Sequence, residues 1–494
     1  LEHPVSADVS VNDCFRPVSR FFDRISRPEQ LLTALPEAMR VLTDPAETGA
    51  VTIAVPQDVQ AHAYDYPVHF FEKRIWRIER RPPPEERIKE AICMLRTAKR
   101  PLIIAGGGVH YSEAWTELQA FAVQCGLPVG ETFGGKGAIL ESSDMGLGGF
   151  GVTGTPVSGK LGAEADLILA VGTRLTDFST GSQGAFANPD VKFICINVNS
   201  HDAFKQGALP IVADAREALK VLTAEATKAG IDPDESYVEE IKTAKAAWEK
   251  TVADEIYVDH PGESVNPARL VQILNEEAGD EDCVVAAAGS PPGDLHRLWN
   301  VTAGASCYLE FGYSCMGWEI PAALGIRMSG KHDEVFVYIG DGTYLMNPTE
   351  LMTAMQEGLK VTIVISENHG YQIIWSLQMA RAGREFGNEF RARDEGANKL
   401  EGEYLRIDFA KNAESFGART WQVNTADGLR EALKQAREET RVCVIVCETE
   451  KHRFLPQSGV WWDIASAEAS NDPMTRKLRE GWEAERRTLQ RFHY

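Results

Sequence analysis

The sequence predicts an α/β protein made of doubly wound parallel sheets and divided into two or three domains. Short β-branched apolar runs, such as Pro101 to Ala105 and Val335 to Ile339, alternate with amphipathic helical patterns. This alternation is typical of parallel sheets that carry helices on both faces. The chain has 494 residues, which is more than one hydrophobic core usually supports, so we expect more than one domain.

Residues 1–70 contain one clear αβ unit. Pro28 to Leu42 has the apolar spacing of an amphipathic helix, and Val51 to Val55 is a β-branched run that ends before a proline. Because a lone strand cannot form a sheet, we interpret this unit as the last part of a larger α/β domain that begins upstream of Leu1. The charged, proline-rich character of residues 71–85 indicates a linker.

Two further regions repeat the alternation of strands and helices. Residues 86–230 are expected to form a central domain, and residues 270–455 a third domain. Between them, residues 231–269 form a mostly polar connecting segment, and residues 456–494 form a charged helical tail. Gly106 to Gly108 follows the first central strand, but it lacks the GxGxxG spacing and the acidic residue of a dinucleotide site, so we favour a tight turn there.

The composition favours an enzyme that acts on small molecules. With 72 acidic and 51 basic residues, the formal charge is −21, which would repel nucleic acids and anionic lipid surfaces. The apolar strand runs are far shorter than the roughly 20 residues that cross a bilayer. Nine cysteines, an odd number with no CxxC pair, argue against a disulfide framework or a structural zinc site and favour a cytoplasmic location.

The most informative motif follows the strand Val335 to Ile339 as Gly340-Asp341-Gly342-Thr343. Asn368 follows the next strand, Val361 to Ile365, and so reaches the same edge of the predicted sheet. A glycine-flanked turn that opens a helix exposes backbone N–H groups that suit phosphate. A carboxylate, an amide oxygen and a backbone carbonyl together make the oxygen shell that Mg²⁺ prefers.

This pattern resembles the signature of the thiamine-diphosphate (ThDP) enzyme superfamily, in which GDG is followed by a helix, a strand and two asparagines. The resemblance implies that Asp341, Asn368 and the carbonyl of Gly370 bind Mg²⁺. Glu367 stands in place of the first asparagine, but the metal ligand of the motif is the second one. The cofactor-binding residues that the resemblance implies are Gly289, Ser290, Gly340, Gly342, Thr343 and Asn368.

The resemblance also assigns roles in the chemistry. Met316 corresponds to the apolar wedge that bends the cofactor into a V, and the carbonyl of Ser314 would accept a hydrogen bond from its 4′-amino group. Judged alone, Met316 would be a core methionine that fills a gap. His296 and His369 lie near the same sheet edge and are candidates for proton transfer. Each is more often a hydrogen-bonded structural histidine.

Within the superfamily the fold comprises three doubly wound domains, and a paired subunit completes each active site. The resemblance therefore implies that residues 1–70 are a remnant of the pyrimidine-binding domain and that residues 270–455 bind diphosphate and Mg²⁺. It also implies a homodimer or homotetramer. The glutamate that activates the cofactor lies early in the pyrimidine-binding domain, so we expect it upstream of Leu1.

A closer resemblance, over essentially the whole chain, is to the hydrolases that open trihydroxycyclohexane-1,2-dione in myo-inositol catabolism. It implies hydrolytic opening of a cyclic, polyol-derived 1,2-diketone to 5-deoxyglucuronate. Residues Gln372 to Trp375 depart from the family pattern, which leaves the substrate open. The segments that carry the resemblance are Leu42 to Ala50, Pro292 to Leu295, Tyr308 to Gly317, Asp341 to Met346 and Phe386 to Arg391.

Three other functions stay open at this point. A carboligase or decarboxylase of the acetolactate-synthase type would share the cofactor site and release CO₂ from pyruvate. A non-catalytic subunit would bind ThDP without turnover. The central domain could hold a flavin or another nucleotide, as it does in some relatives, although nothing in this sequence requires it.

Overall fold

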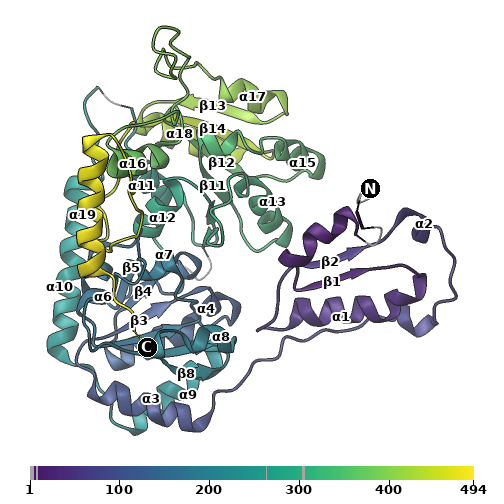
Figure 1. Ribbon diagram of the computed structural model, residues 1–494, viewed down its shortest axis with the longest axis vertical. Coiled ribbons are helices and arrows are strands. Elements are labelled where there is room, and N and C mark those ends of the chain that lie inside the picture. The colour runs from purple at the N-terminus through teal and green to yellow at the C-terminus, as the bar shows by residue number, and fades with distance from the viewer. Residues whose placement is uncertain (1–4, 7–8, 263, 303–305, 494) are drawn as a thin grey trace.

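The computed structural model describes residues 5–6, 9–262, 264–302 and 306–493. Figure 1 shows a small N-terminal unit, in purple, beside a larger body that contains two parallel sheets. Each large sheet has six strands, and all of its pairings are parallel. The predicted class, an α/β protein with doubly wound parallel sheets, is confirmed.

The N-terminal unit is a two-stranded parallel sheet with one long helix. Strand β1 (Phe21–Arg24) pairs with β2 (Val51–Ala54), and α1 (Leu31–Thr43) connects them. The expectation of a lone strand was therefore wrong, because the short run Phe21–Arg24 supplies a partner. Two strands alone are only marginally stable. The unit also contains η1 (Val11–Val18), η2 (Pro28–Gln30), α2 (Gln57–Gln60) and η3 (Val68–Phe71).

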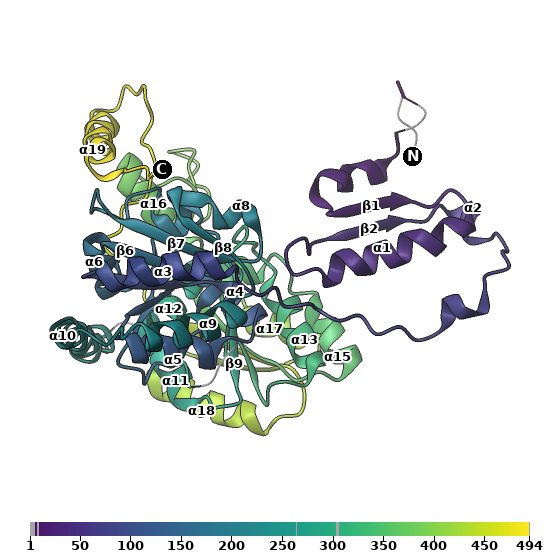
Figure 2. The same cartoon turned by 90° about the horizontal axis from the view of Figure 1, so that it is seen from below.

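An extended segment, residues 73–84, joins this unit to the body without forming a helix or strand (Figure 2). Its C-terminal end is held against the central domain by ion pairs and a backbone hydrogen bond. Arg80 forms ion pairs with Asp214 and Glu113, both at 3.1 Å, and the Arg81 carbonyl accepts the Asp214 N–H at 2.9 Å.

The central sheet has the strand order β5-β4-β3-β6-β7-β8. At its carboxyl edge the turn after β3 packs against the turn after β6. A Cβ on Gly106 would lie 2.5 Å from the carbonyl oxygen of Gly172, and a Cβ on Gly108 would lie 2.5 Å from the Cα of Gly172. Backbone packing therefore accounts for these glycines. The strands are β3 (Pro101–Ala105), β4 (Val129–Glu131), β5 (Gly146–Gly149), β6 (Leu167–Val171), β7 (Lys192–Asn197) and β8 (Leu209–Val212).

Helices surround the central sheet and lead into the next one. They are α3 (Glu85–Thr97), α4 (Gly107–Tyr111), α5 (Trp115–Cys125), η4 (Phe133–Gly135), α6 (Pro156–Glu164), α7 (Asp177–Thr180), α8 (Ser200–Ala203), η5 (Lys205–Gly207) and α9 (Ala215–Lys228). The helix α10 (Glu235–Thr251) and a π-helical turn, η6 (Val252–Ile256), follow in the connecting segment.

The C-terminal sheet has the order β10-β9-β11-β12-β14-β13. Alternate residues of its strands enter two separate cores. Val284 lies in the core with α11 (Pro267–Glu277), α12 (Pro291–Leu298) and α18 (Ala426–Glu438), whereas Val285 lies in the core with α13 (Glu319–Ser329), α15 (Glu350–Glu357) and α17 (Phe409–Ser415). This is the pattern of a sheet that is buried on both faces. The strands are β9 (Cys283–Ala286), β10 (Cys307–Leu309), β11 (Val335–Gly340), β12 (Thr362–Glu367), β13 (Arg419–Val423) and β14 (Cys443–Glu448).

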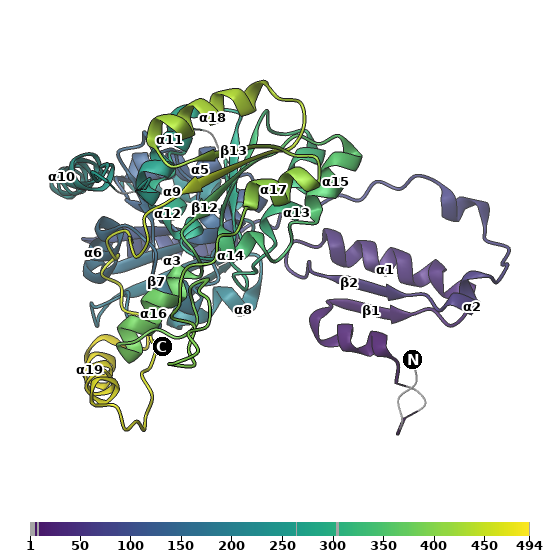
Figure 3. The ribbon, with the colours of Figure 1, turned by 90° about the horizontal axis from the view of Figure 1, so that it is seen from above.

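The last helix, α19, lies beside α16, as Figures 1 and 3 show. In the described part of the chain, every helix is too short or too polar to cross a lipid bilayer. The helices of this region are α11 (Pro267–Glu277), α12 (Pro291–Leu298), α13 (Glu319–Ser329), α14 (Asp341–Tyr344), α15 (Glu350–Glu357), α16 (Gln372–Ala382), α17 (Phe409–Ser415), α18 (Ala426–Glu438) and α19 (Pro473–Leu489).

Candidate active site

The three predicted metal ligands lie together at the carboxyl edge of the C-terminal sheet. Strands β11 and β12 are paired, so the residues that follow them meet. Asp341 is fully buried at the start of α14. Its Oδ1 accepts the Gly342 N–H at 2.6 Å, and its Oδ2 accepts the N–H groups of Asn368 at 3.0 Å and Gly370 at 3.1 Å.

The donor chemistry of this edge fits a magnesium ion. Burial raises the pKa of Asp341 to about 6, although the three backbone donors oppose the shift, so a cation would stabilise the charged carboxylate. Among the described residues, no group hydrogen-bonds the side-chain amide of Asn368. The Gly370 carbonyl accepts only one N–H, from Gln372 at 3.1 Å, and so keeps a free lone pair. Asp341, Asn368 and Gly370 therefore bring a carboxylate, a side-chain amide and a backbone carbonyl to one sheet edge, and Mg²⁺ prefers oxygen ligands of these kinds.

Further acidic groups surround the same edge. Burial, together with the charges of Asp341 and Glu448, raises the pKa of Glu367 to about 7. Glu367 and Glu448 end the paired strands β12 and β14 and face each other in register. The edge therefore concentrates negative charge, which favours a cation and disfavours an unaccompanied anion.

The glycine turns at this edge leave room for a ligand. A Cβ on Gly340 would meet nothing within 4 Å, so packing within the chain does not require a glycine there. By contrast, a Cβ on Gly342 would lie 2.4 Å from the Tyr371 ring. Gly289 adopts a left-handed φ of 83°, and Ser290 caps α12 next to it. Because β9 pairs with β11, this second turn lies on the same edge as the first.

The loop after β10 is held in an unusual conformation by one carboxylate. Glu310 accepts the N–H groups of Gly312 at 2.6 Å, Tyr313 at 2.9 Å and Cys315 at 2.9 Å. Ser314 has a φ of 54°, a left-handed conformation that is unfavourable for a residue with a side chain. Met316 is 38% exposed and is therefore not a core methionine in this chain.

A cavity of about 1630 Å³ lies between the turn after β9 and the central domain, and of the described residues that line it none is a predicted metal ligand. It is lined on one side by Gly289, Ser290 and the loop from Glu310 to Ser314, and on the other side by central-domain residues that include Phe133 and Thr153. Single-ligand pockets usually measure about 300–1,000 Å³, so this cavity is larger than one small ligand requires.

Comparisons with known proteins agree with this geometry. Residues 88–222 match the family model of the thiamine pyrophosphate enzyme central domain, and residues 287–447 match that of the C-terminal TPP binding domain. A 3D-(3,5/4)-trihydroxycyclohexane-1,2-dione hydrolase of Clostridium tetani is 41% identical over 97% of this chain and 78% of its own length. The chain belongs to this hydrolase family.

Other members of the family are similar to the same extent. Hydrolase 2 of Bacillus cereus strain ZK is 40% identical over 95% of this chain and 76% of its own length. A Bacillus anthracis hydrolase is 40% identical over 96% of this chain and 77% of its own length. These relatives are therefore longer than the present chain.

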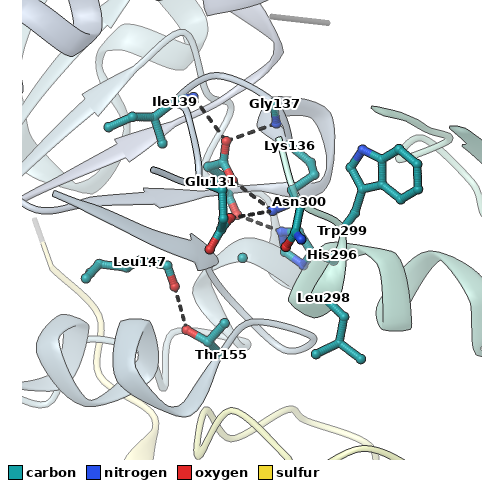
Figure 4. Close-up of polar contacts among 12 residues, drawn as sticks. Glu131, Lys136, Gly137, Ile139, Leu147, Thr155, His296, Leu298, Trp299 and Asn300 are labelled. Atoms are coloured by element: carbon teal, nitrogen blue, oxygen red, sulfur yellow. Dashed lines mark hydrogen bonds and ion pairs between the residues drawn. The ribbon is translucent and has the colours of Figure 1, made fainter. Parts of the chain in front are cut away.

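The structure does not bring His296 to the metal edge. His296 is buried in the contact with the central domain (Figure 4), where its Nε2 donates to the Glu131 carbonyl at 2.7 Å and its Nδ1 lies 3.0 Å from the Thr153 hydroxyl. Burial lowers its pKa to about 3. Both ring nitrogens are occupied, so these contacts favour the structural interpretation of His296 that the sequence left open.

Beside His296 lies a buried ion pair between Glu131 and Lys136 (Figure 4). The Lys136 Nζ lies 3.3 Å from Glu131 Oε2 and 3.9 Å from Glu141 Oε2. Burial opposes the charge on Lys136, but the two carboxylates outweigh it and raise its pKa. The remaining Glu131 oxygen accepts the N–H groups of Gly137 and Ile139. The sequence analysis did not identify this pair.

His369 lies between the predicted metal ligands Asn368 and Gly370, in the turn after β12, which we call the metal turn. Its φ is 63°, and its ring stacks on Tyr404 with 4.9 Å between centroids. Its Nδ1 is 3.2 Å from Glu367 Oε1, which leaves Nε2 free for another partner. Burial and the nearby Lys451 lower its pKa. Of the two histidines that the sequence suggested, only His369 lies with the predicted metal ligands.

Glu319 is a residue of this edge that the sequence analysis missed. It is fully buried at the first turn of α13, where Oε1 accepts the Ala288 N–H at 3.3 Å and Oε2 accepts the Gly317 N–H at 3.0 Å. Burial raises its pKa to about 7. Glu319 thus ties the turn after β9 to the loop that carries Met316. An acidic residue at the start of an apolar helix was the available signal.

Proposed function

We propose that this protein hydrolyses 3D-(3,5/4)-trihydroxycyclohexane-1,2-dione, opening its ring to 5-deoxyglucuronate in inositol catabolism, with ThDP and Mg²⁺ as cofactors. The observation that carries the proposal is the 41% identity with the Clostridium tetani hydrolase over 97% of the chain. The position of Asp341, Asn368 and Gly370 at one sheet edge, where the Asp341 carboxylate accepts the N–H groups of the other two, supports it independently.

We assign Asp341, Asn368 and the Gly370 carbonyl to Mg²⁺. The assigned diphosphate contacts are Gly289, Ser290, Gly340, Gly342 and Thr343, together with Asn368 through the metal. When bound, ThDP supplies the electron sink for breaking a carbon–carbon bond next to a carbonyl. The chain's own residues bind it, orient it and exclude water.

Residues of the loop and the metal turn complete the proposed chemistry. The carbonyl of Ser314 would accept a hydrogen bond from the cofactor's amino group, and Met316 would support the cofactor between its two rings. His369 exchanges a proton with the substrate at Nε2, while Nδ1 stays near Glu367. The lowered pKa of His369 keeps the ring neutral near pH 7, so Nε2 can accept a proton.

The subunit arrangement is part of the proposal. Residues 1–70 would be the remnant of the pyrimidine-binding domain, 71–85 a linker, 86–230 the central domain, 231–269 a connection, 270–455 the diphosphate and Mg²⁺ domain and 456–494 the tail. Tyr313 and Phe386 are 90% and 83% exposed near the site. Exposed aromatic side chains of this kind are typical of surfaces that another subunit covers, which supports a homodimer or homotetramer. We place the enzyme in the cytoplasm.

The test is turnover of the cyclic trihydroxy-dione by the whole polypeptide, including any residues that precede Leu1. We expect an open-chain acid, detected by NMR, that requires Mg²⁺ and ThDP and forms without release of CO₂. Pyruvate should give little acetolactate, because a site that hydrogen-bonds a polyhydroxylated ring leaves its polar groups unpaired with pyruvate.

The outcomes separate the alternatives. Robust acetolactate formation from pyruvate would replace the hydrolase with a carboligase. Opening of a different cyclic dione would keep the chemistry and change the substrate. Tight binding of Mg²⁺ and ThDP without turnover of any dione would identify a non-catalytic subunit.

A further inference from the structure

The segment Phe386 to Arg391 folds back against the metal turn, although none of its residues is a proposed ligand. Gly370 and Glu389 form an antiparallel bridge. On either side of it, the Tyr371 N–H donates to the Asn388 carbonyl at 2.8 Å, and the Phe390 N–H donates to the His369 carbonyl at 2.9 Å. The backbone of this segment therefore brackets Gly370.

The contact is tight enough to determine where the Gly370 carbonyl lies. Gly370 has a φ of 138°, and a Cβ there would lie 2.4 Å from the Asn388 carbonyl oxygen and 2.8 Å from the Cα of Glu389. Only a glycine permits this approach. Any shift of residues 388–389 would therefore move the turn that offers the carbonyl oxygen.

Glu389 is the centre of the hydrogen bonds that hold this segment. Its side chain is only 3% exposed. Oε2 accepts Arg391 Nε at 2.7 Å and the Tyr404 hydroxyl at 2.9 Å, and Oε1 accepts His452 Nε2 at 3.0 Å. Arg391 balances the buried charge, so the carboxylate is both paired and hydrogen-bonded.

A side-chain amide connects this carboxylate to the metal turn. Gln372 Nε2 lies 3.4 Å from Glu389 Oε1 and donates to the backbone carbonyl of Asn368 at 3.0 Å. Gln372 Oε1 in turn accepts the His452 N–H at 3.3 Å. The sequence departure at Gln372 thus supplies the link between Glu389 and a proposed metal ligand.

We infer that Glu389 is a positioning residue for the magnesium site, acting through Gln372 and the backbone of residues 388–390 to hold Asn368 and Gly370. The inference rests on the proposed function, because it needs the metal edge to bind Mg²⁺. Mg²⁺ requires near-octahedral geometry with short bonds, so it tolerates little displacement of its ligands. Groups that orient metal ligands typically change metal affinity by about 10–100-fold.

The test is calorimetric titration of Mg²⁺ at saturating ThDP, in the whole polypeptide first stripped with chelator. Glu389→Gln keeps the shape and loses the charge that holds Arg391 and Tyr404, and we expect the Kd for Mg²⁺ to rise about 10-fold. The matched control is Glu395→Gln, which makes the same change at an exposed position in the segment that follows Arg391. It should leave the Kd within about two-fold, since no metal ligand depends on it.

A measurement at excess Mg²⁺ distinguishes a positioning role of Glu389 from misfolding of the variant. At saturating Mg²⁺ the ThDP affinity of Glu389→Gln should return to that of the wild type, whereas a misfolded variant would stay weak. Gln372→Ala removes the side-chain contacts with Asn368, Glu389 and His452 but keeps the Glu389 carboxylate with Arg391, so it should raise the Kd for Mg²⁺ in the same direction, by less.

The outcomes keep this inference distinct from the proposed function. A wild-type protein that binds neither Mg²⁺ nor ThDP would overturn the proposed function. A wild-type protein that binds both, with unchanged Kd values for Mg²⁺ in Glu389→Gln and Gln372→Ala, would overturn the positioning role alone.

Discussion

Replacing Asp341 by asparagine should weaken the binding of Mg²⁺. It should leave the stability of the cofactor-free protein unchanged or increase it. The carboxylate accepts three backbone N–H groups, from Gly342, Asn368 and Gly370, and it is the anionic member of the proposed ligand set. Asp341→Asn keeps the shape but leaves one acceptor oxygen and no charge. Binding of Mg²⁺ should therefore fall sharply, and Mg²⁺-dependent binding of ThDP should fall with it.

The size of the loss follows from the charge and the contacts. Among the proposed ligands only Asp341 carries a charge, so the cation loses its strongest protein ligand. A loss of about 3 kcal/mol in binding free energy corresponds to roughly a 100-fold rise in the Kd for Mg²⁺. We expect at least this change at pH 7.

The stability of the cofactor-free protein should respond differently. Burial raises the pKa of Asp341 from 3.8 to about 6. The folded protein therefore disfavours the ionised form, and this penalty is absent below about pH 4 and fully present above about pH 6. Two pKa units amount to roughly 3 kcal/mol. Since asparagine carries no charge, Asp341→Asn should unfold at the same or a higher urea concentration than the wild type at pH 7.

Calorimetry with Mg²⁺ and ThDP, together with urea unfolding in chelator, measures both quantities. Wild-type-like Mg²⁺-dependent ThDP affinity in Asp341→Asn would refute the assignment of the metal site. A large loss of stability without cofactor would instead show that the carboxylate serves the fold, because its three backbone contacts would then outweigh the burial of its charge.

Two further predictions concern the buried pair and the assembly. Lys136→Met leaves the Glu131 carboxylate buried without a cation and should lower the free energy of unfolding by about 3–5 kcal/mol in urea titrations. Adding Glu131→Gln should recover much of that loss, and additive losses would argue against coupling. Light scattering at micromolar concentration should give at least a dimer mass, and Tyr313→Asp should shift it downward. A fully active wild-type monomer is incompatible with a site completed by a second subunit.

Most of the strands that the sequence revealed lie in the interior of a six-stranded sheet and consist of a continuous apolar run. The apolar runs Pro101 to Ala105, Val335 to Ile339 and Val361 to Ile365 match β3, β11 and β12 to within two residues at each end. The sequence did not predict six strands, which are β1, β4, β5, β8, β10 and β13. Most of these are short or lie at sheet edges, and β13 is half exposed and polar along its length. Such strands are fixed by pairing with a neighbour, which local apolar runs do not report.

The same distinction explains which site residues could be predicted. Asp341, Asn368 and Gly370 directly follow strands, and parallel pairing alone brings them together. His296 also follows a strand, but it lies within a helix. Gly293, His296 and Arg297 share one face of α12, and that face contacts the central-domain turn around Thr153. Orientation about a helix axis depends on what the helix packs against, which a single sequence does not contain.

The acidic edge also determines how the proposed cofactors must bind. The strands β11, β12 and β14 deliver Asp341, Glu367 and Glu448 to one place, and burial already disfavours the charges of Asp341 and Glu367. A diphosphate approaching alone would meet these carboxylates and be repelled, whereas Mg²⁺ neutralises part of the charge and offers coordination to both partners. Binding free energies are linked reciprocally, so each cofactor must strengthen the binding of the other by the same factor.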